Sequence, residues 1–252
     1  MIFDVHAHYD DEAFNEDRDI LLNKLFSNNV CGIVNATTDE NSQNISLDFT
    51  KKYDNMWTTI GYHPECSQSV PKNYLELMNE RLKDEKAVAI GEIGLDYYWK
   101  DVPKEEQMPL FENQLKLSKD LDMPVVIHNR EAHLDIMTML KKYKPKGIVH
   151  CFSGSVEMSR EIMKLGMYIS LGGVVTFKNA RHSIEVVKDM PIERLLLETD
   201  APYLSPVPFR GKRCDSSMIS LVAEKIAEIK GISVEKVLEI TCANAKEVYN
   251  LK

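Results

Sequence analysis

The chain lacks the features that mark secreted, membrane-spanning and disulfide-stabilised proteins. It has no apolar run of about 18 residues, and its first residues show no charged segment followed by a short apolar one. Its five cysteines are odd in number and show no CxxC spacing, which is typical of free thiols. These absences lead us to expect a soluble cytoplasmic protein that makes no membrane contact, and we favour a monomer.

Positive charge is also scarce, and several catalytic motifs are absent. The formal net charge of -8 argues against a long, non-specific nucleic-acid surface. It still allows a small acidic substrate held by a metal and a few local cations. The sequence contains no GxSxG nucleophile motif and no phosphate-binding P-loop. Serine-hydrolase and P-loop chemistry are therefore not predicted.

What the chain does have is a regular alternation of apolar runs and helical patterns. Eight runs, most of them apolar on successive residues, are typical of parallel strands covered on both faces. They span residues 1–8, 31–37, 56–63, 87–94, 124–128, 147–152, 167–172 and 195–200. Segments of helical period lie between and after them, at 18–29, 39–53, 71–84, 104–121, 133–143, 155–165, 180–188, 216–230 and 233–249.

This order predicts an α/β fold of the (β/α)8 TIM-barrel type. Eight strand–helix units in 252 residues match the usual size of that barrel, and no linker or repeat interrupts the series. We therefore expect residues 1–252 to form a single domain. A doubly wound open sheet is the alternative, but its glycine-rich phosphate fingerprint does not follow the first strand.

Ionisable residues gather where the predicted strands end, which is where TIM barrels build their active sites. Five of the seven histidines lie there, whereas His133 and His182 fall in predicted helices. The candidates are His6, His8, His63, Glu92, His128, His150 and Asp200. Each has a plainer interpretation as a hydrogen-bonded rim residue, an ion-pair partner or a turn former. All of those interpretations would have to hold at once, and two carboxylates buried together without cations are strongly unfavourable.

A divalent metal centre resolves that conflict. Residues i and i+2 of a strand point to the same face, so His6 and His8 can aim at one ion. Imidazole and carboxylate ligands suit zinc, manganese, nickel, cobalt or iron. Six ligands exceed the three protein ligands of a typical catalytic zinc, whereas two ions would use them all. Glu92 is the natural bridging carboxylate.

The chemistry that such a centre favours is hydrolysis by a metal-activated water. A divalent ion lowers the pKa of bound water towards neutrality, and Asp200 is the candidate to orient that water and take its proton. A dyad of Cys151 with His150 is improbable, because adjacent strand residues point to opposite faces.

With these residues assembled, the whole chain resembles the TatD family of metal-dependent hydrolases, which are amidohydrolase-like barrels also called TatD-related deoxyribonucleases. The resemblance rests on FDVHAH at 3–8, GYHPE at 61–65, GEIGLDYY at 91–98, PVVIHNR at 124–130, HCFSGS at 150–155, GGVVTFKNA at 172–180, LLLETDAPYLSP at 195–206, RGKR at 210–213 and ANA at 243–245. HxH alone is a weak motif, but the ordered set is highly specific.

The resemblance implies a binuclear centre and a substrate class. Its ligands would be His6, His8, Glu92, His128, His150 and Asp200, with Glu92 between the ions and Asp200 assisting the water. The implied activity is a deoxyribonuclease acting on single-stranded or 3′ ends of DNA. Some relatives are credited with cleaving RNA or with removing D-amino acids from tRNA, so a deacylase is the alternative. Zinc, magnesium and manganese all remain candidates, and a scaffold with an inert metal site is the non-enzymatic alternative.

Cations near the predicted rim are candidates for holding a phosphate. We assign His63, Arg130 and Arg210 to substrate binding, because arginine suits bidentate phosphate contacts. Solvated surface charge is the better interpretation for Lys178, Arg181, Lys212 and Arg213. Tyr97, Tyr98, Trp99 and Phe152 are candidates for stacking on a base, although packing is the commoner role. The sequence departs from the family in one place: Cys214 stands where an asparagine is usual.

Overall fold

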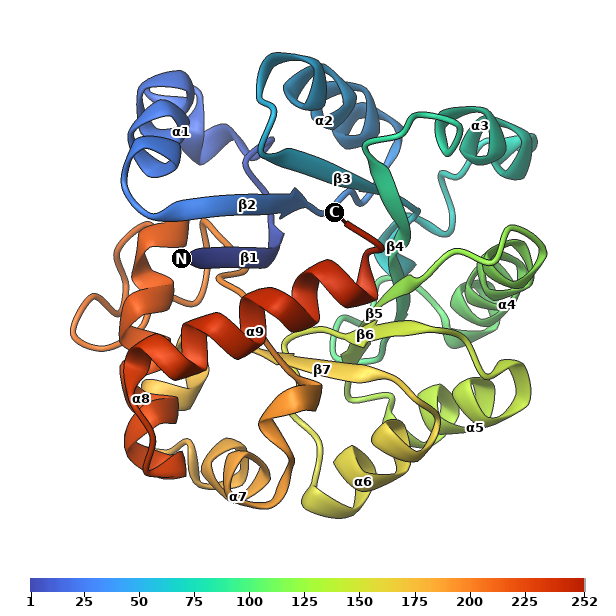
Figure 1. Cartoon of the computed structure of the whole chain (residues 1–252). Coiled ribbons are helices and arrows are strands. Elements are labelled where there is room, and N and C mark those ends of the chain that lie inside the picture. The colour runs from blue at the N-terminus through green and yellow to red at the C-terminus, as the bar shows by residue number, and fades with distance from the viewer. Residues whose placement is uncertain (252) are drawn as a thin grey trace.

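The computed structural model describes residues 1–251, and its centre is a ring of eight parallel strands (Figure 1). The strands are β1 (Ile2–Ala7), β2 (Val30–Asn35), β3 (Met56–Ile60), β4 (Ala87–Asp96), β5 (Val125–Arg130), β6 (Gly147–Val149), β7 (Tyr168–Leu171) and β8 (Leu195–Leu197). Each strand pairs with the next one in sequence order. This arrangement confirms the predicted (β/α)8 barrel.

Helices surround the ring, and the last one crosses an end of it (Figure 1). They are α1 (Arg18–Ser27), α2 (Glu40–Lys52), α3 (Tyr74–Arg81), α4 (Lys104–Asp120), α5 (His133–Tyr143), α6 (Val156–Lys164), α7 (Arg181–Asp189), α8 (Ile219–Lys230) and α9 (Val234–Val248). Their ends differ from the predicted ones by at most three residues. Within residues 1–251, no helix combines the length and apolarity needed to cross a membrane.

The predicted strand ends were less accurate than the helix ends. β3, β6 and β8 each stop three residues before the predicted end, whereas β4 and β5 each continue for two more. His128, expected at the end of its strand, therefore lies inside β5. After β8 the ladder stops because the amide of Thr199 donates to the side chain of Asp4 in β1, at 3.0 Å, in place of a strand carbonyl.

The seam between β1 and β8 closes through these side-chain and loop hydrogen bonds. Asp4 accepts from the Thr199 hydroxyl at 2.6 Å as well as from its amide. The Asp200 amide donates to the carbonyl of His6 at 3.0 Å. Asp200 itself has φ 60, in the left-handed region that aspartate adopts more readily than most residues. The first strand and the segment after the last strand are thereby locked together.

Helix α9 covers the end of the barrel where the strands begin (Figure 1). Its Ala245, Val248 and Tyr249 belong to the buried cluster that fills the barrel, together with residues near the starts of the strands such as Val88 and Val126. The Tyr249 hydroxyl also donates to the carbonyl of Val5 at 2.9 Å. With this end sealed, the opposite end is the one open to ligands.

Asn244 attaches α9 to the barrel, and its loss is expected to be costly. Its buried amide donates to two backbone carbonyls, those of Ile192 and Leu195, at 2.9 and 2.8 Å. Asn244→Ala leaves both acceptors without that donor, so we expect the free energy of unfolding to fall by about 2–3 kcal/mol. Urea denaturation measures the loss. The exposed Lys246→Ala on the same helix is the control, expected within about 0.5 kcal/mol of the parent.

Candidate metal centre

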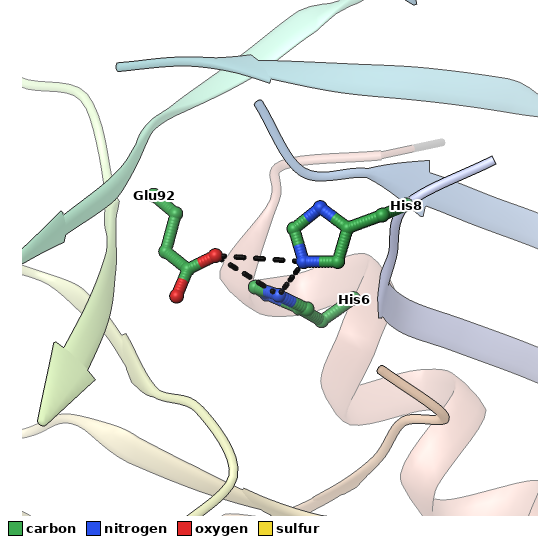
Figure 2. A group of neighbouring side chains, drawn as sticks. All are labelled: His6, His8 and Glu92. Atoms are coloured by element: carbon green, nitrogen blue, oxygen red, sulfur yellow. Dashed lines mark hydrogen bonds and ion pairs between the residues drawn. The ribbon is translucent and has the colours of Figure 1, made fainter. Parts of the chain in front are cut away.

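Four donor atoms meet at the open end of the barrel. The Nε2 atoms of His6 and His8 lie 3.1 Å apart, and each is 3.4 Å from Oδ1 of Asp200. Oε2 of Glu92 lies 3.4 Å from His6 Nε2 and 3.6 Å from His8 Nε2. Figure 2 shows the two rings and the carboxylate pointing at one another. His6 lies in β1, His8 directly follows that strand, Glu92 lies in β4, and Asp200 lies in the segment after β8.

The spacing of these four atoms fits a tetrahedrally coordinated ion. Zinc binds imidazole nitrogen and carboxylate oxygen at about 2.0–2.2 Å, which places neighbouring tetrahedral ligands about 3.3–3.6 Å apart. The five separations given above are 3.1–3.6 Å, close to that expectation. Two imidazoles and two carboxylates are also ligands that borderline divalent metals accept.

A second group of donors faces the other oxygen of Glu92. Oε1 of Glu92 lies 2.8 Å from Nδ1 of His128 and 2.8 Å from Nε2 of His150. The two ring nitrogens are 3.4 Å apart. Nε2 of His63 is 3.6 Å from the same oxygen, so His63, which we predicted to bind substrate, lies beside this second group of donors. The two oxygens of Glu92 therefore lie close to different histidines.

The remaining ring nitrogens fix the orientation of two of these histidines. Nδ1 of His8 lies 3.1 Å from the carbonyl of Ala36, so that it donates and leaves Nε2 free as a ligand. Nε2 of His128 is 3.0 Å from Oδ2 of Asp96, which leaves Nδ1 to face Glu92. Asp96, whose role the sequence did not indicate, thus orients His128.

Two glutamines of α4 hold the segments that carry this machinery. Gln107 accepts from the amide of Asp96 at 2.8 Å and donates to its carbonyl at 2.7 Å. Gln114, two turns further along, makes the same pair of bonds with Tyr62, the neighbour of His63, at 2.8 and 3.0 Å. Residues seven apart on a helix share one face. The side-chain amides of both buried glutamines therefore hydrogen-bond to backbone at the rim of the barrel.

Burial and charge act in opposite directions on the pKa values of the group. Burial alone raises the pKa of Glu92, but His150 and His6 beside it hold that pKa well below its usual range. Burial lowers the pKa of His6, yet Glu92, Asp200 and Glu198 together outweigh burial and raise it well above the usual value. For His128, Asp96 and Glu92 overcome burial and raise the pKa to about 9. Glu92 therefore stays ionised, and it favours the protonated forms of His6 and His128.

His63 and His150 have the opposite shift. Burial, reinforced by the neighbouring imidazoles, lowers the pKa of His63 to about 3 and that of His150 to about 4. Both rings are therefore neutral at pH 7. A neutral imidazole has the free lone pair that a metal ligand or a proton acceptor needs.

Two buried carboxylates behind the centre were missed at the sequence level. Burial raises the pKa of Glu198 to about 8, and its Oε1 accepts from the Cys151 amide at 2.7 Å and lies 3.8 Å from Nδ1 of His150. Burial also raises the pKa of Asp4, to about 6. The available signal was an acidic residue inside an apolar run, in IFDV and LLLET. An unpaired acid there is costly unless neighbouring donors satisfy it.

A cavity of about 800 Å³ is lined by His8, His63, His128, His150 and Asp200 of this group. Of the residues predicted to bind substrate, His63 and Arg130 line this cavity, and Trp99 lines it too. Arg210 is not among the lining residues, because its guanidinium lies over the ring of Phe177, 4.3 Å from the centroid.

Other predicted roles agree with the structure. Arg181 and Arg213 pair with Glu185 and Asp17 at the surface. Phe152 is buried, as packing requires. Cys214 is also buried, and its amide donates to the carbonyl of Pro202 at 2.9 Å. Ahead of α8, Asp215 caps the short 3-10 turn Ser216–Met218 by accepting from the amide of Ser217.

Removing the partner of His128 should weaken metal binding. In an Asp96→Ala protein the His128 ring loses the acceptor that fixes its orientation, so we expect affinity for one ion to fall about 10–100-fold. Asp96→Asn keeps an acceptor without charge, so its affinity for the ion should lie between those of the parent and of Asp96→Ala. Competition with a chromophoric chelator measures both. Equal affinity in all three proteins would contradict the orienting role.

Comparison with known proteins agrees with this geometry. The sequence profile of the family described as "TatD related DNase" matches residues 3–250. The chain is 42% identical to the uncharacterized metal-dependent hydrolase YabD of Bacillus subtilis, over 100% of both chains, and 33% identical to YcfH of Escherichia coli, over 100% of this chain and 96% of the relative. The crystal structure of the TatD homologue YjjV from Escherichia coli superposes with a TM-score of 0.93 at 28% identity, covering 100% of this chain and 98% of that one. With the histidines and carboxylates of a metal site gathered at the barrel mouth, the chain belongs to the TatD family and is a metal-dependent hydrolase.

Proposed function

We propose that the protein is a deoxyribonuclease that hydrolyses phosphodiester bonds at single-stranded or 3′ ends of DNA, using two divalent ions. The observation that carries the proposal is Glu92, whose two oxygens face separate pairs of histidines. A carboxylate in that position suits a bridge between two ions. Bound ions would polarise the phosphodiester and lower the pKa of the attacking water.

The ligand sets follow from these distances. His6, His8 and Asp200 would hold the first ion with Oε2 of Glu92. His128 and His150 would hold the second with Oε1 of Glu92, and the two groups share no other residue. The chain supplies no cysteine to either group, so zinc, manganese and magnesium all remain candidates.

The remaining roles belong to residues that line the cavity. Asp200 is ionised, because His6 and His8 hold its pKa well below the usual range against the effect of burial. It can therefore orient the nucleophilic water and accept its proton. Arg130 offers a guanidinium at the mouth, and the neutral His63 offers a ring nitrogen beside the second group. We assign both residues to holding the phosphate.

A specificity for chain ends follows from the charge of the lining. Asp10, Asp11 and Glu65 line the cavity, and among residues 1–251 Arg130 is the only lysine or arginine that does. Two divalent ions would balance the acidic groups around one phosphate. A long polyanion threaded through the mouth would meet too little positive charge. We place the activity in the cytoplasm, since the five cysteines carry no disulfide.

The same acidic lining supports the alternative, a deacylase acting on an aminoacyl ester such as D-aminoacyl-tRNA. Asp10, Asp11 and Glu65 are suited to a protonated amino group near the reacting carbonyl. The metal ligands would serve both reactions, because each has an electrophile to polarise and a water to activate. Neither the ligands nor the acidic lining therefore separates the two functions, and only substrate assays can do so.

The decisive experiment offers every substrate to the same preparation. End-labelled single-stranded DNA, duplex DNA, RNA and D-aminoacyl-tRNA are each incubated with metal-loaded protein, with and without EDTA. We expect the protein to shorten single-stranded DNA. EDTA should stop this shortening, and the Asp200→Asn variant should not shorten the DNA. If the DNA survives while the acyl bond is cleaved, the deacylase is the function and the nuclease proposal is wrong.

A further inference from the structure

An aromatic turn stands at the mouth of the cavity. Tyr98 and Trp99 follow β4 and leave 49% and 48% of their surfaces exposed. Their rings meet edge to face, with centroids 4.9 Å apart, and Trp99 lines the cavity. The chain has only two tryptophans, and an indole left half exposed gives up much of the stabilisation that burial would provide. The exposed faces are therefore available to a flat ligand.

Arg130 lies against this turn as an unpaired cation. Its guanidinium is 4.0 Å from the ring centroid of Tyr98 and 5.5 Å from that of Trp99. Within residues 1–251, no carboxylate forms an ion pair with it. A guanidinium stacked on a ring keeps its donors free and loses little side-chain freedom when an anion binds. Arg130 is thus oriented in advance for a phosphate.

One carboxylate ties the aromatic turn to the metal centre. Oδ1 of Asp96 accepts from the amides of Tyr98 and Trp99, at 2.9 and 3.2 Å. Its Oδ2 is the partner of His128 at 3.0 Å. Arg130 lies two residues beyond His128 in the same strand. The positions of the ring, the cation and the candidate ligand are therefore fixed relative to one another.

We propose that Trp99 and Arg130 form a nucleotide subsite, in which the base next to the scissile bond stacks on the indole and a phosphate binds the guanidinium. The subsite rests on the proposed function for its place in the reaction. An exposed aromatic face, an arginine with no ion-pair partner and a candidate metal centre could bind the base and the phosphates of a nucleotide. Stacking on an indole tolerates every base, so the subsite would act on DNA ends without sequence preference.

Tryptophan fluorescence tests the subsite without any need for turnover. Trp57 lies in β3 and stacks on Phe3, 5.7 Å between centroids, among residues near the starts of the strands. In a Trp57→Phe protein, Trp99 is the only remaining tryptophan. Titrating the metal-loaded variant with deoxyadenosine monophosphate should quench its emission saturably. Deoxyribose 5-phosphate, which has no base, should compete for the site without quenching.

Substitutions then separate the two halves of the subsite. Arg130→Gln in the same background should weaken binding of the mononucleotide about 10-fold. Trp99→Ala in the parent protein should raise KM on an oligodeoxynucleotide about 10-fold, and the loss should vanish when the terminal nucleotides are abasic.

The outcomes also distinguish this proposal from the nuclease proposal. Saturable, base-dependent quenching in a protein that cleaves no DNA would leave the subsite standing while the nuclease assignment fails. DNA cleavage with no quenching, or equal quenching by the sugar phosphate, would overturn the subsite.

Discussion

If the proposed centre holds two ions, replacing Glu92 with alanine is expected to remove one of them and to lower hydrolysis by about 10³-fold or more. The side chain is buried, and its two oxygens face both groups of histidines at 2.8–3.6 Å. Losing a bridging ligand removes several kcal/mol of transition-state stabilisation, and about 4 kcal/mol corresponds to about 10³-fold in rate. Metal analysis of the dialysed protein gives the stoichiometry, and initial rates give the activity.

Two further variants serve as controls for the Glu92→Ala measurement. Glu92→Gln keeps the shape of the side chain without its charge, so the same loss in both variants rules out a cavity effect. Glu65→Ala removes a carboxylate that lines the cavity and lies 3.9 Å from His63, outside the proposed ligand set. It should keep two ions per chain. If the Glu92→Ala protein still bound two ions per chain, Glu92 would not be the bridging ligand.

Gly94→Ala is expected to lower the free energy of unfolding by about 4 kcal/mol. Gly94 pairs with His128 across β4 and β5, and its φ of +150° is one that side chains rarely allow. A Cβ there would lie 2.0 Å from the carbonyl oxygen of His128. Overpacking costs about 1–3 kcal/mol, and a forced backbone costs a similar amount. The shift of the urea midpoint at constant slope gives the change.

Gly231 supplies the matched control. It ends α8 at φ +67, and no atom lies within 4 Å of the place where a Cβ would stand. Gly231→Ala therefore carries only the left-handed penalty, about 1–2 kcal/mol. If the two alanine variants were equally stable, the close approach of β4 and β5 at Gly94 would be wrong.

The fold was predictable because its signal is local. Apolar runs and helical periods depend on residues close together in the chain, and they located every strand and helix of the barrel. The strand ends depend on contacts that the pattern does not contain. The ladder of β8 stops early because Thr199 bonds to Asp4, 195 residues away. The amphipathic pattern of α9 likewise predicted a buried face without indicating that the barrel end would cover it.

The candidate site was predictable to the extent that strand ends meet at one rim. That rule placed His6, Glu92 and His128 on different strands and brought them together, as the distances bear out. The rule does not predict the orientation of a histidine ring. The role of Asp96 could therefore be inferred only from its hydrogen bond to His128. Arg210 lies in a loop, where no periodicity fixes position, and it stacks on Phe177 away from the cavity.

The seam between β1 and the segment after β8 also decides when the metal centre can exist. His6 and His8 stand on one side of it, and Asp200 stands on the other. As a chain emerges from the ribosome, the candidate ligands His6 and His8 are made about 190 residues before their candidate partner Asp200. An ion joining the two sides would then act as a reversible crosslink, and its binding would add directly to the stability of the closed ring. The centre is therefore among the last parts of the molecule to assemble, and metal depletion should loosen the barrel at this seam first.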